Sequence, residues 1–165
     1  MSEFVKIVEV GARDGLQNEK TALTLAQRKD FILDLMKTGV QAIEVGSCVS
    51  AKWVPQMADS DSLFSQLPKN PNIQLSLLTP NLKGLQSALA VGCSEVAIFT
   101  AASESFTQKN INCSIEQSFE KFADVMAAAK ANNIKVRGYV SCMVDCPYEG
   151  AIDPKQVVQV SKRLL

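Results

Sequence analysis

The sequence predicts an α/β protein with a parallel (β/α)8 barrel, of which these 165 residues cover about the first five strand–helix units. Short runs that are rich in β-branched residues, or in which apolar and polar residues alternate, are followed by segments with the periodicity of a helix. This order is typical of parallel sheets with right-handed crossovers. The first strand–helix turn, GARDG, lacks the G-x-G-x-x-G fingerprint of dinucleotide-binding sheets. A doubly wound sheet, complete at this length, is the competing architecture, because a full barrel typically needs about 250 residues.

Five apolar runs predict the strands. They are rich in β-branched residues or alternate with period two, as strands packed in a sheet do. The predicted strands are residues 5–10, 42–46, 73–79, 95–100 and 135–142.

The helices between them have readable starts. Thr24-x-x-Gln27 fits a capping box, in which the side-chain oxygen and the later amide satisfy free backbone N–H groups. Ser114-x-x-Gln117 repeats the pattern. Asn81 is a candidate N-cap, and Asp153-Pro154 pairs an N-cap with proline at the first helical position.

The helix ends are also visible, except for the last helix. Gly39 and Gly92 follow apolar helical faces as C′ residues, and prolines end a weakly patterned helix within 56–67. The final segment, VVQVSKRLL, contains no glycine or proline stop. We therefore expect residues 1–165 to be the N-terminal portion of a single barrel domain whose C-terminal strands are absent.

Composition argues against several classes of protein. The net charge is zero, the pI is about 6.3, and the chain has no basic run, which disfavours nucleic acid and anionic membranes as partners. No secretory signal or membrane-length apolar stretch is visible, so a cytoplasmic location is expected. Histidine is absent, and the five cysteines are odd in number and scattered, which favours reduced thiols. Only Cys142-x-x-x-Cys146 is a close pair, and its spacing is not that of a usual zinc site.

Polar residues collect where the predicted strands end, and two acids lie inside apolar strands. Glu9 and Glu44 interrupt the first and second strands, where an unpaired carboxylate costs several kcal/mol. An arginine is the obvious partner for such an acid. The acids then belong either to a functional cluster or to a structural ion pair. In the adjacent Arg13-Asp14 pair, the carboxylate suits a hard cation such as Mg²⁺ or Mn²⁺. The guanidinium can stabilise a developing enolate or hold a carboxylate.

Five stretches resemble one known family across nearly the whole chain. They are VKIVEVGARDGLQNEK, AIEVGSCVSAKWVPQMAD, LLTPNLKG, EVAIFTAASESFTQKNINCSIEQSFE and VRGYVSCMVDCPYEG. Together they resemble the hydroxymethylglutaryl-CoA lyases, members of the metal-dependent lyase and synthase barrels marked by an Arg-Asp pair after the first strand. The resemblance implies a barrel that splits 3-hydroxy-3-methylglutaryl-CoA into acetoacetate and acetyl-CoA with a divalent metal, Mg²⁺ or Mn²⁺.

The resemblance also implies roles for individual residues. Arg13 would be catalytic and would stabilise the enolate and the carbonyl oxygen, and Asp14 would bind the metal. Glu44 would be the second catalytic residue, orienting the metal and the substrate, and Gln17 would contact the substrate on the same turn. Lys20 and Ser47 are weaker candidates for the substrate pocket, and Glu9 is expected to be an internal partner for an arginine.

Some groups that the family needs are not in this sequence. The family completes its metal site with a His-x-His pair and an asparagine from later strands, and it carries a reactive cysteine on a late glycine-rich loop. We therefore expect the 165-residue chain alone to be inactive. The alternatives are a related Claisen-type synthase acting on acyl-CoA, or a non-catalytic half-barrel. Exposed strands at the open barrel edge would favour a homodimer or another association.

Overall fold

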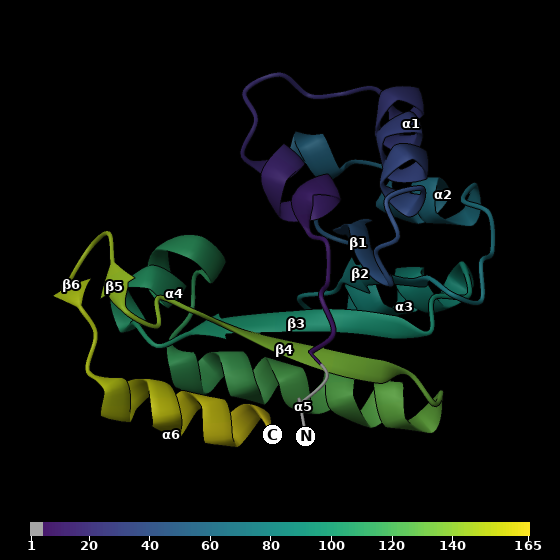
Figure 1. The fold of residues 1–165 in the computed structure, drawn as a ribbon. Coiled ribbons are helices and arrows are strands. Elements are labelled where there is room, and N and C mark those ends of the chain that lie inside the picture. The colour runs from purple at the N-terminus through teal and green to yellow at the C-terminus, as the bar shows by residue number, and fades with distance from the viewer. Residues whose placement is uncertain (1–4) are drawn as a thin grey trace.

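The computed structural model, which describes residues 5–165, is built on a four-stranded parallel sheet (Figure 1). Its strands lie side by side in the order in which they occur in the chain. Each new strand is therefore added beside the previous one, as in consecutive units of a (β/α) barrel. The strands are β1 (Ala42–Ser47), β2 (Gln74–Leu78), β3 (Glu95–Ala101) and β4 (Lys135–Ser141).

Helices connect these strands and cover one side of the sheet, and α5 and α6 run along β3 and β4 (Figure 1). The predicted helices are present, including the weakly patterned one, which is shorter than its window and follows a 3-10 turn, η2 (Pro55–Met57). The helices are α1 (Leu25–Met36), α2 (Ser60–Ser65), α3 (Leu82–Ala90), α4 (Glu104–Ile111), α5 (Ile115–Ala131) and α6 (Pro154–Leu164).

Local sequence signals set the helix boundaries as expected. Both capping boxes form, because Thr24 and Ser114 each exchange side-chain and backbone hydrogen bonds with the glutamine three residues later. Asn81 and Asp153 cap α3 and α6. Gly39 has a φ of 89°, a left-handed conformation that suits glycine at a helix end.

The hydrophobic core lies between the sheet and these helices. Its residues come from alternate positions of the strands and from the inward face of each helix, the pattern that the two periodicities require. Among its fully buried members are Ile32, Ile43, Val45, Leu63, Leu77, Leu85, Val96 and Val125.

The predicted first strand is wrong over most of its length. Residues 5–10 form only one bridge, in which Glu9 pairs in parallel with Ile43. Val5 and Ile7 are 77% and 73% exposed. An alternating apolar run becomes a strand only where a neighbour supplies hydrogen bonds and apolar cover, and here β1 reaches only Glu9. The sheet therefore contains four of the five predicted strands.

Two elements after the third and fourth strands were not predicted. Helix α4 starts directly after β3, with Ser103 as its N-cap. A small antiparallel hairpin of β5 (Asp145–Cys146) and β6 (Gly150–Ala151) follows β4. Both lie beyond the carboxyl ends of β3 and β4, at the left of Figure 1.

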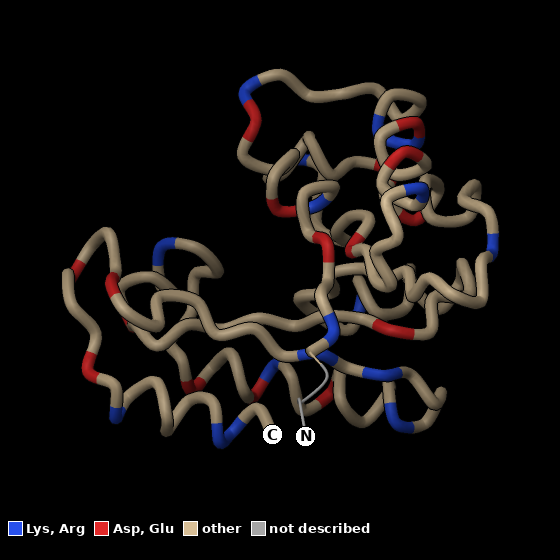
Figure 2. Tube along the Cα trace, viewed as in Figure 1, with Lys and Arg blue, Asp and Glu red and all other residues tan. Residues whose placement is uncertain are grey.

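Acidic and basic residues are intermixed along the described chain (Figure 2). None of the helices in residues 5–165 is both long enough and apolar enough to cross a membrane.

Candidate functional site

The site begins at a tight turn, the π-helical segment η1 (Gly11–Gly15), which carries Arg13 and Asp14. The backbone N–H groups of Arg13 and Asp14 both donate to the carbonyl of Val10, at 3.0 and 2.7 Å. The N–H of Gly11 donates to Glu9 Oε1 at 2.6 Å. A Cβ on Gly11 would lie 2.8 Å from that oxygen, so a larger residue at this position would force the Glu9 side chain to move. Glu9 therefore fixes the turn through the backbone, and its expected role as an arginine partner is wrong.

Glu44 is the main partner of Arg13. Arg13 Nε donates to Glu44 Oε1 at 2.5 Å, and Arg13 Nη1 donates to Asp14 Oδ1 at 2.7 Å. The guanidinium also lies over the Tyr139 ring, with Cζ 5.9 Å from the ring centroid. Three neighbours from the turn, β1 and β4 thus hold the guanidinium in one orientation.

The carboxylate of Glu44 is completely buried but fully paired. Its second oxygen accepts a hydrogen bond from the Tyr139 hydroxyl at 2.8 Å. A buried carboxylate is tolerated only when its charge and its lone pairs are satisfied, and this pairing meets that condition. The acid inside the apolar strand is therefore explained by Arg13 and Tyr139.

The network continues along the sheet toward the amino ends of the strands. Arg137 Nη1 donates to the Tyr139 hydroxyl at 3.4 Å, and Arg137 Nη2 is paired with Glu95. Lys6 Nζ lies 3.8 Å from the other Glu95 oxygen. Glu44 and Glu95 are both nearly inaccessible to solvent. A continuous chain of charged and polar side chains therefore links the first turn to β1, β3 and β4.

Two pKa values reflect this network. Burial raises the pKa of Tyr139, and the adjacent Glu44 carboxylate adds to the shift. Burial lowers the pKa of Arg137, but Tyr139 and Glu95 outweigh it, so the pKa of Arg137 is raised overall. Tyr139 stays protonated and Arg137 stays charged at neutral pH.

The arrangement suits an anionic ligand. No residue from 5 to 165 accepts a hydrogen bond from Arg13 Nη2, while its other two nitrogens are occupied. An oriented guanidinium with a free donor can bind a carboxylate or stabilise a developing oxyanion.

A metal site is not complete in this part of the chain. Asp14 is the expected metal ligand, and its side chain is 58% exposed beside Arg13. Within residues 5–165 no three side chains of His, Cys, Asp or Glu are grouped as a metal ion requires. These residues alone do not fit a tightly bound divalent ion.

The other predicted substrate residues do not join Arg13. Gln17 is partly buried just after η1, and Lys20 is exposed in the following loop. Neither makes a hydrogen bond to the cluster within residues 5–165. Ser47 is buried at the end of β1, where its N–H donates to Ser60 Oγ at 3.2 Å. The structure therefore brings together Arg13, Asp14 and Glu44. The side chains of the other three predicted residues lie outside this cluster.

Two members of the cluster, Tyr139 and Arg137, were missed by the sequence reasoning. They lie two residues apart on β4, so their side chains share one face of the sheet with Glu44. Polar residues at alternate positions of a predicted buried strand were the available signal, the same signal that identified Glu44.

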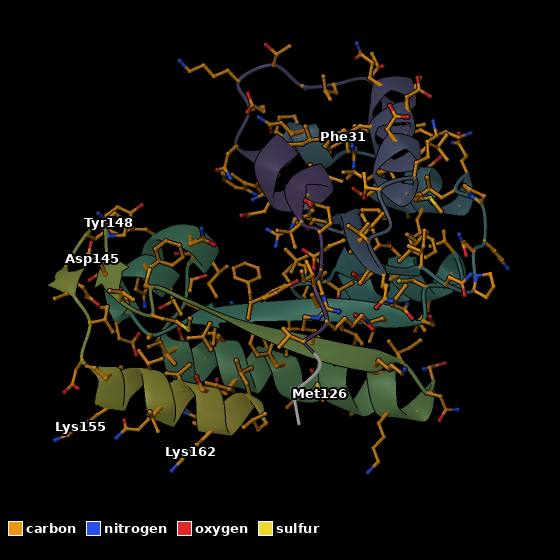
Figure 3. All side chains as sticks on the ribbon, in the orientation of Figure 1. Phe31, Met126, Asp145, Tyr148, Lys155 and Lys162 are labelled. Atoms are coloured by element: carbon orange, nitrogen blue, oxygen red, sulfur yellow. The ribbon has the colours of Figure 1, made fainter. Side chains whose placement is uncertain are left out.

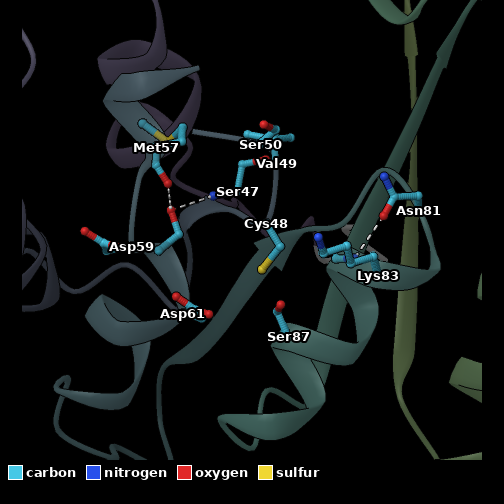
Figure 4. Close-up of a pocket in the computed structure, with 12 residues that line it drawn as sticks. Ser47, Cys48, Val49, Ser50, Met57, Asp59, Asp61, Asn81, Lys83 and Ser87 are labelled. Carbon is cyan, nitrogen blue, oxygen red and sulfur yellow. Dashed lines mark hydrogen bonds between the residues drawn. The ribbon is translucent and has the colours of Figure 1, made fainter. Parts of the chain in front are cut away.

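A cavity of about 260 Å³ lies elsewhere, between the segment after β1 and the start of α3 (Figure 4). Ser47, Cys48, Asp61 and Lys83 are among the residues that line it, and Arg13 and Glu44 are not. Burial raises the pKa of Cys48 to about 12, so its thiol is not a nucleophile at neutral pH. The cavity is therefore a weaker candidate for catalysis than the Arg13 cluster.

Comparisons with known proteins all find the same family. The family description "HMGL-like" matches residues 4–165. The chain is 54% identical over 164 residues to the cytoplasmic 3-hydroxy-3-methylglutaryl-CoA lyase of Rattus norvegicus, covering 99% of this chain and 48% of that protein. The hydroxymethylglutaryl-CoA lyase structure from Pseudomonas aeruginosa has a TM-score of 0.93 and 51% identity, covering 97% of this chain and 53% of its own.

A third relative was solved with ligands. It is described as an HMG-CoA lyase from Acinetobacter baumannii in complex with coenzyme A and 3-methylmalate, and it has a TM-score of 0.92 at 30% identity. The match covers 99% of this chain and 54% of that structure. The chain thus spans about half the length of the relatives it matches.

Proposed function

Because the chain belongs to the HMGL-like family, we propose that the whole protein is a carbon–carbon lyase that cleaves 3-hydroxy-3-methylglutaryl-CoA to acetoacetate and acetyl-CoA. The observation that carries the proposal is the orientation of Arg13 by the buried Glu44, within a turn that also presents Asp14. The names of the relatives support an acyl-CoA as the substrate.

Arg13 has the central role in the proposed reaction. Cleavage of the carbon–carbon bond leaves an electron pair on the acetyl-CoA fragment, and negative charge develops on the thioester oxygen. A guanidinium fixed by Glu44 and Tyr139 can donate to that oxygen without reorganising, which lowers the barrier. Glu44 is a positioning residue in this scheme, because both of its oxygens are occupied by Arg13 and Tyr139.

Asp14 is proposed as one ligand of a divalent cation, Mg²⁺ or Mn²⁺. The cation would supply Lewis-acid chemistry at the substrate oxygens. Its remaining ligands would come from outside residues 5–165, because this part of the chain has no suitable group of acids, cysteines or histidines. Gln17, Lys20 and Ser47 are retained as proposed substrate-pocket residues that depend on further chain to complete the pocket.

Arg13→Gln in the full-length protein tests the proposal. We expect kcat to fall by about 10²–10³-fold, the typical effect of removing one donor that stabilises an oxyanion. Lys121→Gln, which removes one exposed positive charge on α5 away from the turn, is the control and should lose far less. Equal losses in both variants would contradict the role of Arg13.

The reaction class is tested by its products. With 3-hydroxy-3-methylglutaryl-CoA and Mg²⁺ or Mn²⁺, the full-length protein should release acetoacetate and acetyl-CoA. Condensation of acetyl-CoA with a 2-oxo acid, without such cleavage, would instead favour the Claisen-type synthase.

The 165-residue chain is proposed to be inactive by itself, because one carboxylate cannot hold the metal firmly. Turnover of the substrate by the purified chain with Mg²⁺ would disprove this. A cytoplasmic location and self-association through the open sheet are further proposals; the rat relative is named cytoplasmic, and sizing chromatography measures the association.

A further inference from the structure

Helix α1 carries a buried arginine that does not belong to the Arg13 cluster. Arg28 lies three residues before Phe31, which Figure 3 labels, and only 2% of it is exposed. Within residues 5–165 it forms no ion pair, and its Nε has no hydrogen-bond partner. Burial lowers the pKa of Arg28, as expected for a cation removed from water. An ion pair therefore does not explain why this charge is buried.

The two terminal nitrogens of Arg28 hold the chain where α2 begins. Nη1 donates to the carbonyl of Ala58 at 2.6 Å, and Nη2 donates to the hydroxyl of Ser60 at 3.0 Å. Asp59, between these two acceptors, has a φ of 55°, a left-handed conformation that residues other than glycine rarely adopt. The planar guanidinium thus fixes the chain on both sides of a strained backbone position.

The Ser60 hydroxyl connects Arg28 to the end of β1. It accepts a hydrogen bond from the N–H of Ser47 at 3.2 Å and donates to the carbonyl of Met57 at 2.7 Å (Figure 4). With the bond from Arg28, its one donor and both of its acceptor positions are used. Ser47 and Ser60 are both buried. A change at Arg28 therefore reaches the β1 backbone through a single buried hydroxyl.

Strand β1 contains one extra residue between Glu44 and Ser47. Glu44 pairs with Ser76 of β2, but Ser47 pairs with the residue only two positions further along β2, Leu78. In a regular strand, residues three apart lie on opposite faces of the sheet. The two β2 partners lie on one face, so the extra residue places Glu44 and Ser47 on one face too. The irregularity therefore brings a proposed substrate residue to the face that carries the Arg13 cluster.

Arg28 and Ser60 pack directly against this irregular part of β1. A Cβ on Gly46 would lie 2.5 Å from Ser60 Oγ and 3.1 Å from Arg28 Nη2. A larger residue at position 46 would therefore push both side chains away from the strand. The contact joins α1, the start of α2 and β1 at one point, and it lies at the position where the register of β1 shifts.

We propose that Arg28 is a positioning residue, which through Ser60 fixes the irregular end of β1 and keeps Ser47 on the face that binds the substrate. The inference rests on the proposed function, and Arg28 does not itself touch the substrate in this scheme. Arg13 is oriented by a separate bond to Glu44. Arg28 should therefore affect substrate binding more than the chemical step.

Arg28→Gln in the full-length protein, assayed with 3-hydroxy-3-methylglutaryl-CoA and Mg²⁺, tests the proposal. KM should rise by about 3- to 10-fold, the range that one typical hydrogen bond contributes, while kcat changes by less than about twofold. Lys29→Gln, which removes a partly exposed positive charge at the next position of α1, is the matched control and should leave both constants unchanged. An unchanged KM in Arg28→Gln, or a loss of kcat as large as the rise in KM, would overturn the proposal.

Ser60→Ala tests the connection while Arg28 stays in place. It removes the hydroxyl that joins Arg28 to Ser47 and should raise KM to a similar extent. Because the two residues act as one unit, the double variant should raise KM no more than the larger single change does. Multiplied effects, or a normal KM in Ser60→Ala, would contradict the inference. If circular dichroism shows that Arg28→Gln does not fold, the KM of Ser60→Ala decides alone.

The outcomes separate this inference from the proposed function. If the parent protein does not cleave the substrate, or if Arg13→Gln retains the parent kcat, the proposed function fails. If the parent is active and Arg13→Gln lowers kcat, while Arg28→Gln and Ser60→Ala keep the parent KM, only the role of Arg28 is disproved.

Discussion

The two edges of the sheet are stabilised in different ways. At one end, β3 and β4 pair in register over their full lengths, from Glu95–Lys135 to Ala101–Ser141, and α5 and α6 pack beside them. At the other end, residues 5–10 reach β1 through one bridge at Glu9. Yet the candidate catalytic turn follows this weakly paired segment.

The difference shows how the turn keeps its place. Arg13 is attached to the sheet through its side chain, by a bond to the buried Glu44 on β1 and by contact with Tyr139 on β4. The strand ladder stabilises β4 directly, whereas the turn depends on a few charged and aromatic contacts. Substitutions can test separately the stability that comes from strand pairing and the stability that comes from the side-chain contacts of the turn.

The largest expected effect is that of Glu44→Ala. It leaves the Arg13 guanidinium without its main partner in a mostly buried place, and breaking such a pair costs about 3–5 kcal/mol. Urea unfolding measures the loss. Asp14→Ala removes the exposed carboxylate on the other side of Arg13 and should cost about 1 kcal/mol or less. A similar cost for both substitutions would contradict attachment through Glu44.

Tyr139→Phe should have a smaller effect. It removes the hydroxyl that donates to Glu44 Oε2 but keeps the ring beneath Arg13. Leaving a buried acceptor unsatisfied costs about 1–3 kcal/mol. Tyr148→Phe, on the hairpin, is the control with the same chemical change, because its hydroxyl is not part of this network.

Alkaline pH should progressively weaken the contact between the Tyr139 hydroxyl and Glu44. The pKa of Tyr139 is raised in the folded state, chiefly by burial, so the folded chain holds this proton more tightly than the unfolded chain. The resulting stability is fully present below the unfolded pKa, about 10, and is lost as pH rises through the folded value. Urea unfolding between neutral and strongly alkaline pH should show a smaller decline for Tyr139→Phe than for the parent. Equal declines would contradict the link.

The smallest effect is expected for Ile7→Ser in the weakly paired segment. Its side chain is 73% exposed, so the free energy of unfolding should change by no more than about 0.5 kcal/mol. Leu77→Ala, in the core at β2, should cost about 2–5 kcal/mol. A loss above about 1 kcal/mol for Ile7→Ser would show that this segment packs as a strand in solution.

Local sequence signals were sufficient for most of the fold. The capping boxes at Thr24 and Ser114 formed because each depends on residues three apart in the chain. The segment 5–10 was misjudged for the opposite reason, since its alternation describes a strand but says nothing about how far a neighbour extends. Helix α4 was missed although Ser103 and Phe106 form an ordinary cap.

In the candidate site, too, some features follow from the sequence and others only from the tertiary structure. The sequence by itself determined that Arg13 and Asp14 share a turn and that the acid at Glu44 needs a partner, because adjacency and burial cost are properties of the chain. Only the tertiary structure decided that Glu44 pairs with Arg13 and Tyr139 and that Glu9 binds the backbone of Gly11. Those outcomes depend on which strands are neighbours and on where loops bend, so they required the three-dimensional arrangement.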